Sequence, residues 1–118
     1  LIDEGCVPFL YAEGSYNSRL ELIKDDLPKG KTLWGFDQTD MAKAKEIIGD
    51  VACIAGNVPT PMLTVGTPKD VEDYVKKLIE TCGDGGGFIV MNGAVIDEAK
   101  PENVKAMIEA TKKYGIYS

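Results

Sequence analysis

Three features are scarce in this sequence of 118 residues: long apolar runs, cysteine and positive charge. No stretch approaches the roughly 20 apolar residues that a transmembrane helix requires, so a membrane-spanning protein is excluded. The 13 Lys and Arg residues are outnumbered by 19 Asp and Glu residues, which leaves a formal net charge of -6. Such a chain repels a phosphate backbone, and nucleic acid is therefore not expected as a partner.

The three cysteines, Cys6, Cys53 and Cys82, lie far apart and form no C-x-x-C pair. Their number and spacing exclude a disulfide scaffold and a zinc ribbon, and favour reduced, buried thiols in a cytoplasmic protein. The chain opens at Leu1 with neither an initiator methionine nor a basic-then-apolar signal segment. We therefore expect residues 1–118 to be one piece of a longer protein.

Short apolar segments alternate with segments of helical periodicity along the whole chain. Four apolar segments, rich in β-branched and aromatic residues, predict strands at residues 7–11, 31–36, 51–55 and 87–91. Each is followed by a predicted helix, at residues 18–26, 41–48, 68–82 and 101–114. The segment after the third strand contains Pro59 and Pro61 and is expected to be a loop.

Capping residues mark the ends of the first two predicted helices. Asn17 or Ser18 is expected to cap the first helix, because a short polar side chain can accept a hydrogen bond from the exposed backbone N–H groups there. Asp40 is expected to cap the second helix for the same reason. Gly49 is expected to end it in a left-handed turn.

The last two helices carry equally clear signals. Thr67, Pro68 and Asp70 form a capping-box-like start to the third helix, whose apolar residues recur at helical spacing. Pro101 begins the fourth helix and Gly115 ends it. Three apolar side chains of this fourth helix are expected to be buried: Val104, Met107 and Ile108.

The strands read as continuous apolar runs, which indicates that both of their faces are covered. Together with the alternation of strand and helix, this predicts an α/β fold with a parallel sheet. The pattern does not separate a flavodoxin-like open sheet from half of a closed barrel, because both are built from right-handed βαβ units.

Linked motifs in the second half of the chain separate the two. Residues 55–71, with Gly56-Asn57, Leu63 and Gly66-Thr67-Pro68, resemble the pattern GN-x-x-P-x-x-L followed by GTP-E-x-V of the uroporphyrinogen decarboxylase superfamily. Residues 87–115 resemble the ending of the same superfamily, with its GG-F-I and E-N-V-x-A-M segments. Several motifs in the right order and spacing are more specific than any one of them.

The resemblance implies a (β/α)8 TIM barrel, of which this chain would supply the last four units, the C-terminal half. The superfamily includes porphyrinogen decarboxylases. It also includes corrinoid-dependent methyltransferases, which move methyl groups between a corrinoid protein and a thiol or similar acceptor. A corrinoid protein or a tetrapyrrole substrate is therefore the expected partner of the complete enzyme.

Barrel active sites form at the carboxyl ends of the strands, which makes the polar residue after each predicted strand a candidate. These residues are Glu13, Asp37, Asn57 and Asn92. Glu13 and Asp37 are the catalytic candidates, because a carboxylate there can act as an acid, a base or a metal ligand. Glu13 could equally be a plain exposed residue, and Asp37 could stabilise its loop through an Asx-turn. Asn57 and Asn92 are candidate ligand-binding residues, although a structural role in the following turn is favoured for Asn57.

The sequence departs from the superfamily at its usual catalytic positions. The zinc ligands of the methyltransferases, a His-x-Cys pair and a later Cys, fall by position on Tyr11, Glu13 and Ala94. One carboxylate cannot replace the N/S ligand set that zinc prefers, so the usual zinc site is not supported and the cofactor stays unknown. Porphyrinogen decarboxylases carry a Gly-His pair that would align with Gly93-Ala94, but this chain has no histidine.

Three functions are compatible with these residues. We expect methyl transfer with a corrinoid protein, in a subfamily without the usual zinc ligands and with Glu13 and Asp37 lining the site. The alternatives are decarboxylation of uroporphyrinogen in porphyrin biosynthesis and a non-catalytic subunit that binds a corrinoid or another partner. The fragment alone is expected to be inactive, and its open sheet edges predict that it self-associates.

Overall fold

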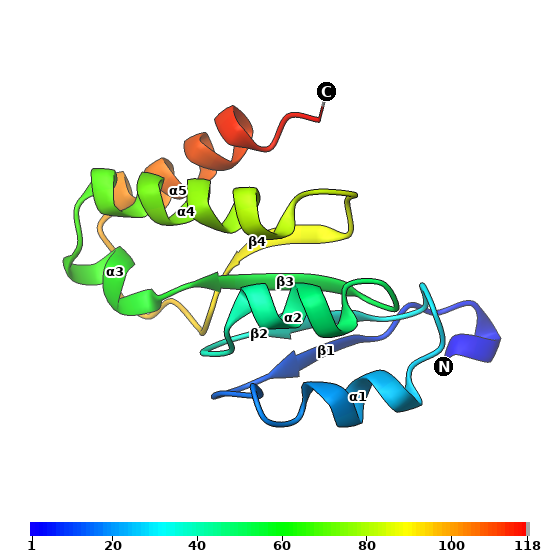
Figure 1. Ribbon diagram of the computed structural model, residues 1–118. Helices are drawn as coiled ribbons and strands as arrows, with labels where there is room; N and C mark the ends of the chain where they lie inside the picture. The colour runs from blue at the N-terminus through cyan, green and yellow to red at the C-terminus, as the bar shows by residue number, and fades with distance from the viewer. Residues whose placement is uncertain (118) are drawn as a thin grey trace.

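The computed structural model of the chain describes residues 1–117 and has four parallel strands in the order β1-β2-β3-β4. The strands are β1 (Phe9–Ala12), β2 (Leu33–Phe36), β3 (Cys53–Val58) and β4 (Phe88–Asn92). The helices are η1 (Ile2–Glu4), α1 (Leu20–Asp26), α2 (Met41–Ile48), α3 (Thr60–Val65), α4 (Pro68–Cys82) and α5 (Pro101–Tyr114). The predicted alternation of strand and helix is confirmed (Figure 1).

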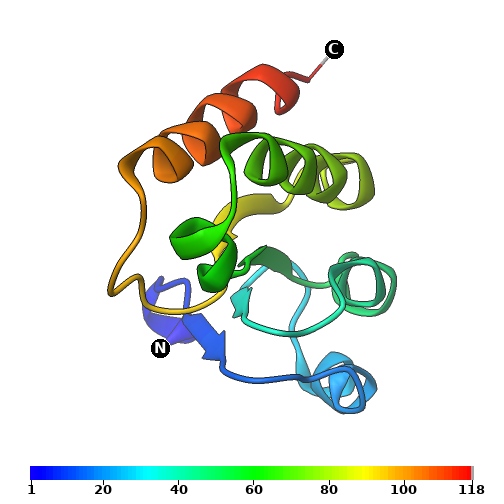
Figure 2. The same cartoon turned by 90° about the vertical axis from the view of Figure 1, so that its left-hand side faces the viewer.

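The longer helices cover one face of the curved sheet and leave the opposite face bare (Figure 2). The core lies between the sheet and these helices and includes Phe36, Ile54 and Val75, which have no exposed surface. On the bare face, Phe9 and Ile89 are 55% and 51% exposed. A sheet that curves away from its helices, with apolar residues on its inner face, is the geometry of part of a (β/α)8 barrel.

Gly35 of β2 lies on this inner face. A Cβ atom at Gly35 would lie 3.0 Å from the ring of Phe9 on β1 and 2.9 Å from the terminal methyl of Met91 on β4. Phe9 therefore leans over β2 from β1, and Met91 reaches over β3 from β4, so both side chains partly fill the concave surface. Register pairs join Phe9 to Leu33 and Leu33 to Cys53, which places Cys53 on the same face.

The helix starts at Asp40 and Thr67 are confirmed. Asp40 accepts hydrogen bonds from the backbone N–H groups of Ala42 and Lys43 at the start of α2. Thr67 and Asp70 form the reciprocal capping box of α4. These caps satisfy backbone N–H groups that would otherwise have no partner within the helix.

Two predicted helix ends are wrong. Neither Asn17 nor Ser18 caps α1, which begins after Arg19 without a side-chain cap, because the Asn17 side chain accepts from the backbone N–H of Asp40 instead. Gly49 ends α2 with φ of -63°, which is not left-handed. Its lack of a side chain serves close packing, since a Cβ atom there would lie 2.3 Å from the carbonyl oxygen of Lys45.

The expected loop after β3 is also wrong, because residues Thr60–Val65 form the short helix α3. Proline is compatible with the first turn of a helix, where its missing N–H costs nothing, and Pro61 stands at that position. The predicted strand positions hold, but β3 runs on through Val58 and β4 through Asn92. Asn57 and Asn92 therefore lie inside the ends of strands and not in the loops after them.

Several residues that the sequence predicts to be buried lie on surfaces that no other part of residues 1–117 covers. On α5 the fully buried residues are Asn103 and Ala110, whereas Val104 and Met107 are half-buried and Ile108 is 49% exposed. The cysteines show the same effect. Cys82 is buried, but Cys53 on the bare sheet face is exposed, as is Cys6 before β1.

The motifs that resemble the superfamily, which we call the signature, include Gly56, Asn57, Thr67 and Asn103. These signature residues hold the second half of the fold together. The Asn103 amide donates to the carbonyl oxygens of Leu63 and Gly66, at 3.1 and 2.9 Å, and so joins α5 to the end of α3. Gly56 has φ of +142°, and a Cβ atom there would lie 2.8 Å from the carbonyl oxygen of Phe36. Only glycine fits that close approach between β3 and β2. Across residues 1–117, no helix has both the length and the apolar character needed to cross a membrane.

Candidate functional site

The carboxyl ends of the four strands meet at one rim of the half-barrel, which faces the viewer in Figure 2. Gly93, directly after β4, connects them. Its N–H donates to the carbonyl oxygen of Val58 on β3, and its carbonyl accepts from the Tyr11 hydroxyl of β1 at 2.6 Å. A Cβ atom at Gly93 would lie 3.0 Å from the carbonyl oxygen of Asp37, so the end of β2 is also in contact. We call Tyr11, Glu13, Asp37 and Gly93 the mouth cluster.

Asp37 follows β2 and uses one carboxylate oxygen within the rim. Its Oδ2 accepts from the backbone N–H of Gly14 at 2.9 Å, and the Gln38 N–H donates to the Gly14 carbonyl oxygen. These two bonds join the loop after β2 to the loop after β1. The second carboxylate oxygen, Oδ1, lies beside Gly93 and has no hydrogen bond from residues 1–117. Asp37 thus stabilises its loop and still has one oxygen that can accept a hydrogen bond.

Glu13 is exposed, and no hydrogen bond or ion pair within residues 1–117 engages its carboxylate. Strand alternation places it on the same inner face as Tyr11, two residues earlier. Burial raises the pKa of the Tyr11 hydroxyl, and the negative charges of Asp37 and then Glu13 raise it further. Both acids therefore lie near that hydroxyl, which stays protonated as a donor.

The two amide candidates are engaged in local structure. Asn57 is buried, its side-chain NH₂ donates to the Thr39 carbonyl oxygen at 2.7 Å, and its side-chain oxygen accepts from the Tyr74 hydroxyl at 3.3 Å. Asn92 donates to the carbonyl oxygen of Ala94, two residues ahead. Of the four candidates, Glu13 and Asp37 both raise the pKa of the Tyr11 hydroxyl through their charges and so belong to the mouth cluster. The structure places Asn57 in a separate network that leads outward to α4.

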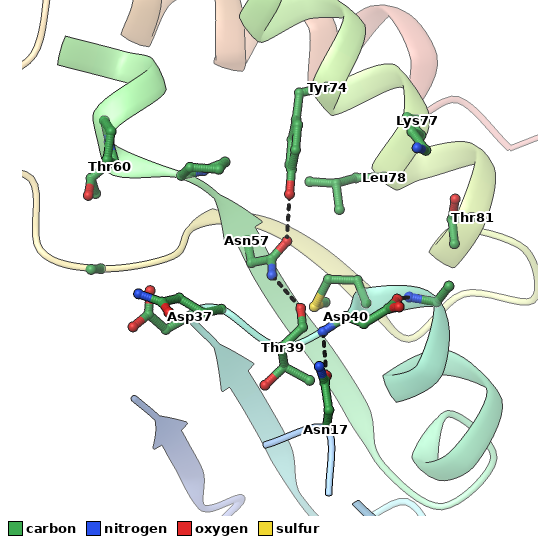
Figure 3. A pocket seen from close by; sticks show the side chains of 16 residues that line it. Asn17, Asp37, Thr39, Asp40, Asn57, Thr60, Tyr74, Lys77, Leu78 and Thr81 are labelled. Atoms are coloured by element: carbon green, nitrogen blue, oxygen red, sulfur yellow. Dashed lines mark hydrogen bonds between the residues drawn. The ribbon is translucent and has the colours of Figure 1, made fainter. Parts of the chain in front are cut away.

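That network forms the floor of a cleft of about 720 Å³ between the loop after β2, α3 and α4 (Figure 3). Asp37 lies at one end of the cleft, and Lys77 and Thr81 of α4 lie at the other (Figure 3). Burial raises the pKa of Tyr74, which lines the same cleft, and the charge of Asp40 adds to this effect. The cleft joins the rim of the barrel to its outer surface and offers both acidic and basic groups.

Tyr11 is the functional candidate that reasoning from the sequence missed. It lies within a predicted strand, where an aromatic residue is typical of the core, and no rule for residues after strands selects it. The signal that could have found it is its spacing. Side chains alternate between the two faces of a strand, so Tyr11, two residues before Glu13, is expected on the same face as Glu13.

The residues present do not fit the zinc site that the resemblance to methyltransferases implies. Tyr11 and Glu13 occupy two of its three positions, and Ala94 the third, so one ligand of the required kind remains. Within residues 1–117, no three His, Cys, Asp or Glu side chains gather as a metal ion would require.

The sequence matches known proteins over almost its whole length. The family model described as uroporphyrinogen decarboxylase (URO-D) matches residues 3–114. Uroporphyrinogen decarboxylase of Methylococcus capsulatus is 30% identical over 116 residues, which are 97% of this chain and 32% of that protein. Uroporphyrinogen decarboxylase of Dichelobacter nodosus is 36% identical over 84 residues, 69% of this chain and 24% of that protein. The chain thus spans at most a third of the length of these relatives.

A solved structure shares the fold. The methyltransferase from Methanosarcina mazei superposes with a TM-score of 0.74 over 93% of this chain and 32% of its own. The identity in sequence is 24%, so the likeness bears on the fold alone. It agrees with four consecutive β/α units of a larger barrel.

Proposed function

The chain belongs to the uroporphyrinogen decarboxylase family, and on this premise we propose that it supplies the C-terminal half of a barrel enzyme that transfers methyl groups with a corrinoid protein. Residues 1–118 would form one structural unit, completed by an N-terminal half. The observation that carries the proposal is the mouth cluster. It presents two carboxylates and a tyrosine hydroxyl at the strand ends, where barrel active sites lie.

The charge of the mouth favours methyl transfer over binding of a polyacid. A methyl group is neutral, and an acceptor with an N–H, O–H or S–H group is attracted to carboxylates that can take its proton. The acidic groups of a porphyrinogen would instead be repelled by Glu13 and Asp37. The basic residue of the adjoining cleft, Lys77, lies at the end away from Asp37 (Figure 3).

The roles of the chain's own residues follow from their bonds. Glu13, which is not engaged elsewhere, takes the proton of the acceptor as the acceptor atom bonds to the methyl group. The bond that breaks would be the one between the methyl group and its donor, a corrinoid on the partner protein, and its electron pair would stay on that donor. Asp37 keeps the loops after β1 and β2 together through Gly14, and its second oxygen can orient the acceptor. Tyr11 positions the end of β4 through Gly93.

Decarboxylation of uroporphyrinogen is the second candidate, and the names of the curated relatives favour it. Such a reaction needs the substrate to be held and a proton delivered, and it requires no zinc. In that case the cations that hold the substrate would have to come from the rest of the barrel. Glu13 and Asp37 would then handle protons in a site built mainly by the other half.

The two functions are separated by one pair of assays on the full-length protein that contains this chain. For methyl transfer, the visible spectrum of a methylated corrinoid protein should change when an acceptor is added. The change should be lost in Glu13→Gln and kept in Glu46→Gln, a matched change on the exposed surface of α2. An unchanged spectrum with every acceptor, together with release of carbon dioxide from uroporphyrinogen, would reject methyl transfer in favour of the second candidate.

A further inference from the structure

One tyrosine of the outer helical layer reaches through that layer to the strand ends. Tyr74 lies on α4 beside Val75, which has no exposed surface and anchors the helix in the core. The Tyr74 hydroxyl donates to the side-chain oxygen of Asn57, and the Asn57 amide donates to the carbonyl oxygen of Thr39 (Figure 3). Thr39 lies in the loop after β2, two residues beyond Asp37. A rigid helix is thereby connected to the loop that carries a candidate catalytic carboxylate.

We propose that Tyr74 is a positioning residue for Asp37 and acts on it through Asn57 and the loop after β2. The inference rests on the proposed function in one respect, namely that Asp37 takes part in turnover. It applies to either of the two candidate reactions. Tyr74 itself would touch no reacting atom.

The loop after β2, residues 37–40, is bound differently on its two sides. Four hydrogen bonds of 2.7 to 2.9 Å join it to residues 14–17 of the loop after β1. From the β3 side, the part of the chain that the structure describes provides a single hydrogen bond to this loop, from the Asn57 amide to Thr39 at 2.7 Å. That bond therefore sets where the two joined loops lie relative to β3, and with them the free oxygen of Asp37.

The orientation of the Asn57 amide depends in turn on Tyr74. The Thr39 carbonyl oxygen can only accept, so the NH₂ group of Asn57 has to face it and the side-chain oxygen has to face away. Asn57 is 6% exposed, and an oxygen without a donor at such a site is costly. Tyr74 supplies the donor. Burial and then the charge of Asp40 raise the pKa of its hydroxyl, which keeps it protonated.

The network contributes orientation more than stability. A buried pair of hydrogen-bonded side chains adds little to stability over an apolar pair of the same shape, and Met41 and Leu78 line the same cleft. Hydrogen bonds that lead from a rigid element to a catalytic group instead hold that group in a productive geometry. A displacement of about 1 Å can lower turnover about 100-fold, so the loss of one link should be measurable.

The experiment is a double-mutant cycle on the full-length protein that contains this chain. Turnover is followed by the corrinoid spectrum or by carbon dioxide release, according to which reaction the protein performs. Tyr74→Phe removes the hydroxyl and keeps the ring, and it should lower kcat about fivefold. In the Asp37→Asn background, which is itself slowed, Tyr74→Phe should change kcat by less than about 1.5-fold, because no carboxylate is left to position.

A matched control and a second readout separate positioning from general loosening of the fold. Tyr114→Phe removes a hydroxyl of α5 that donates to Glu72 on the outer surface, and it should leave kcat unchanged. Hydrogen exchange needs no activity. The backbone amide of Gln38, which donates to the Gly14 carbonyl oxygen, should exchange faster in Tyr74→Phe and at the unmodified rate in Tyr114→Phe.

The outcomes distinguish this inference from the proposed function. Equal fold losses of kcat from Tyr74→Phe in both backgrounds would overturn the inference, because Tyr74 would then act independently of Asp37. An unchanged kcat or an unchanged Gln38 exchange rate in Tyr74→Phe would overturn it as well. Full kcat in Asp37→Asn alone would remove Asp37 from the proposed site and the inference with it. The single variant of Asp37 thus tests the site, and the cycle tests its positioning.

Discussion

Two groups of residues differ in what their side chains bind. One group is the signature residues from β3 to α5, and the other is the acidic residues at the ends of β1 and β2. Asn57 and Asn103 are buried, and each donates to backbone carbonyl groups of a neighbouring segment. Glu13 and Asp37 lie at the rim, and at least one oxygen of each has no hydrogen bond from residues 1–117. The most recognisable residues therefore hold the fold, whereas the residues available for chemistry lie outside the signature.

This difference teaches where family resemblance is informative. A signature built on backbone contacts identifies the barrel, because its residues join α5 to α3 and cap α4. It says little about the reaction, which depends on the side chains at the strand ends. Here those side chains depart from the zinc ligands and the histidine that the sequence resemblance implies at these positions. Variants of the two groups should accordingly affect different properties.

The largest expected effect on stability comes from Asn103. Asn103→Ala removes the buried donor to the Gly66 carbonyl and one of the two donors to the Leu63 carbonyl, which keeps the Lys100 N–H, and we expect the free energy of unfolding to fall by about 2 kcal/mol. Asn17→Ala removes one exposed bond to the backbone of Asp40 and should cost less than about 1 kcal/mol. Urea titrations of both variants measure the difference. Equal losses would mean that burial does not distinguish the two asparagines.

A smaller effect is expected at the capping box. Thr67→Ala removes the acceptor for the backbone N–H of Asp70, and the unfolding free energy should fall by about 1 kcal/mol. Thr81→Ala, on the exposed side of the same helix, serves as the control and should change stability by less than about 0.5 kcal/mol. Thermal and urea unfolding measure both variants. A loss of unfolding free energy in Thr67→Ala no larger than in Thr81→Ala would contradict the capping role.

The smallest effect concerns the response to acid. Hydrogen bonds from Tyr114 and then Lys113 lower the pKa of Glu72 below its ordinary value of 4.5. A lowered pKa stabilises the fold above that ordinary value, and the contribution is lost as the pH falls through the folded pKa. In Tyr114→Phe the Glu72 pKa should move back toward 4.5, which an NMR titration of its carboxyl carbon detects. A pKa that stays in place would show that Lys113 alone sets it.

The regular elements were predictable because their signals are local. The Thr67 capping box and the apolar spacing of α4 lie within one segment, and the structure agrees with the predicted 68–82. The short helix α3 was not predictable in this way. Its prolines are typical of loops, and its end is held by Asn103, which is 37 residues away from Gly66 in sequence.

The candidate site was predictable only in part. The rule for strand ends selects Glu13 and Asp37, and the structure places both near Tyr11. The rule could not show that Gly93 joins β1, β2 and β4. The hydrogen bond from the Tyr11 hydroxyl to the Gly93 carbonyl oxygen joins residues that are 82 positions apart in sequence. Burial on α5 and at Cys53 was mispredicted for a physical reason. A helical or strand pattern indicates which face is apolar, but it does not show whether residues 1–117 supply a neighbour that covers that face.

The most direct test of this division of roles combines stability and turnover in Glu13→Gln of the full-length protein. Because Glu13 makes no contact that holds the fold, the unfolding free energy should stay within about 0.5 kcal/mol of the unmodified protein. Loss of the proton acceptor should lower kcat about 100-fold or more, with Glu46→Gln unchanged in both. A variant that retains full kcat, or that loses activity only because it unfolds, would contradict the account.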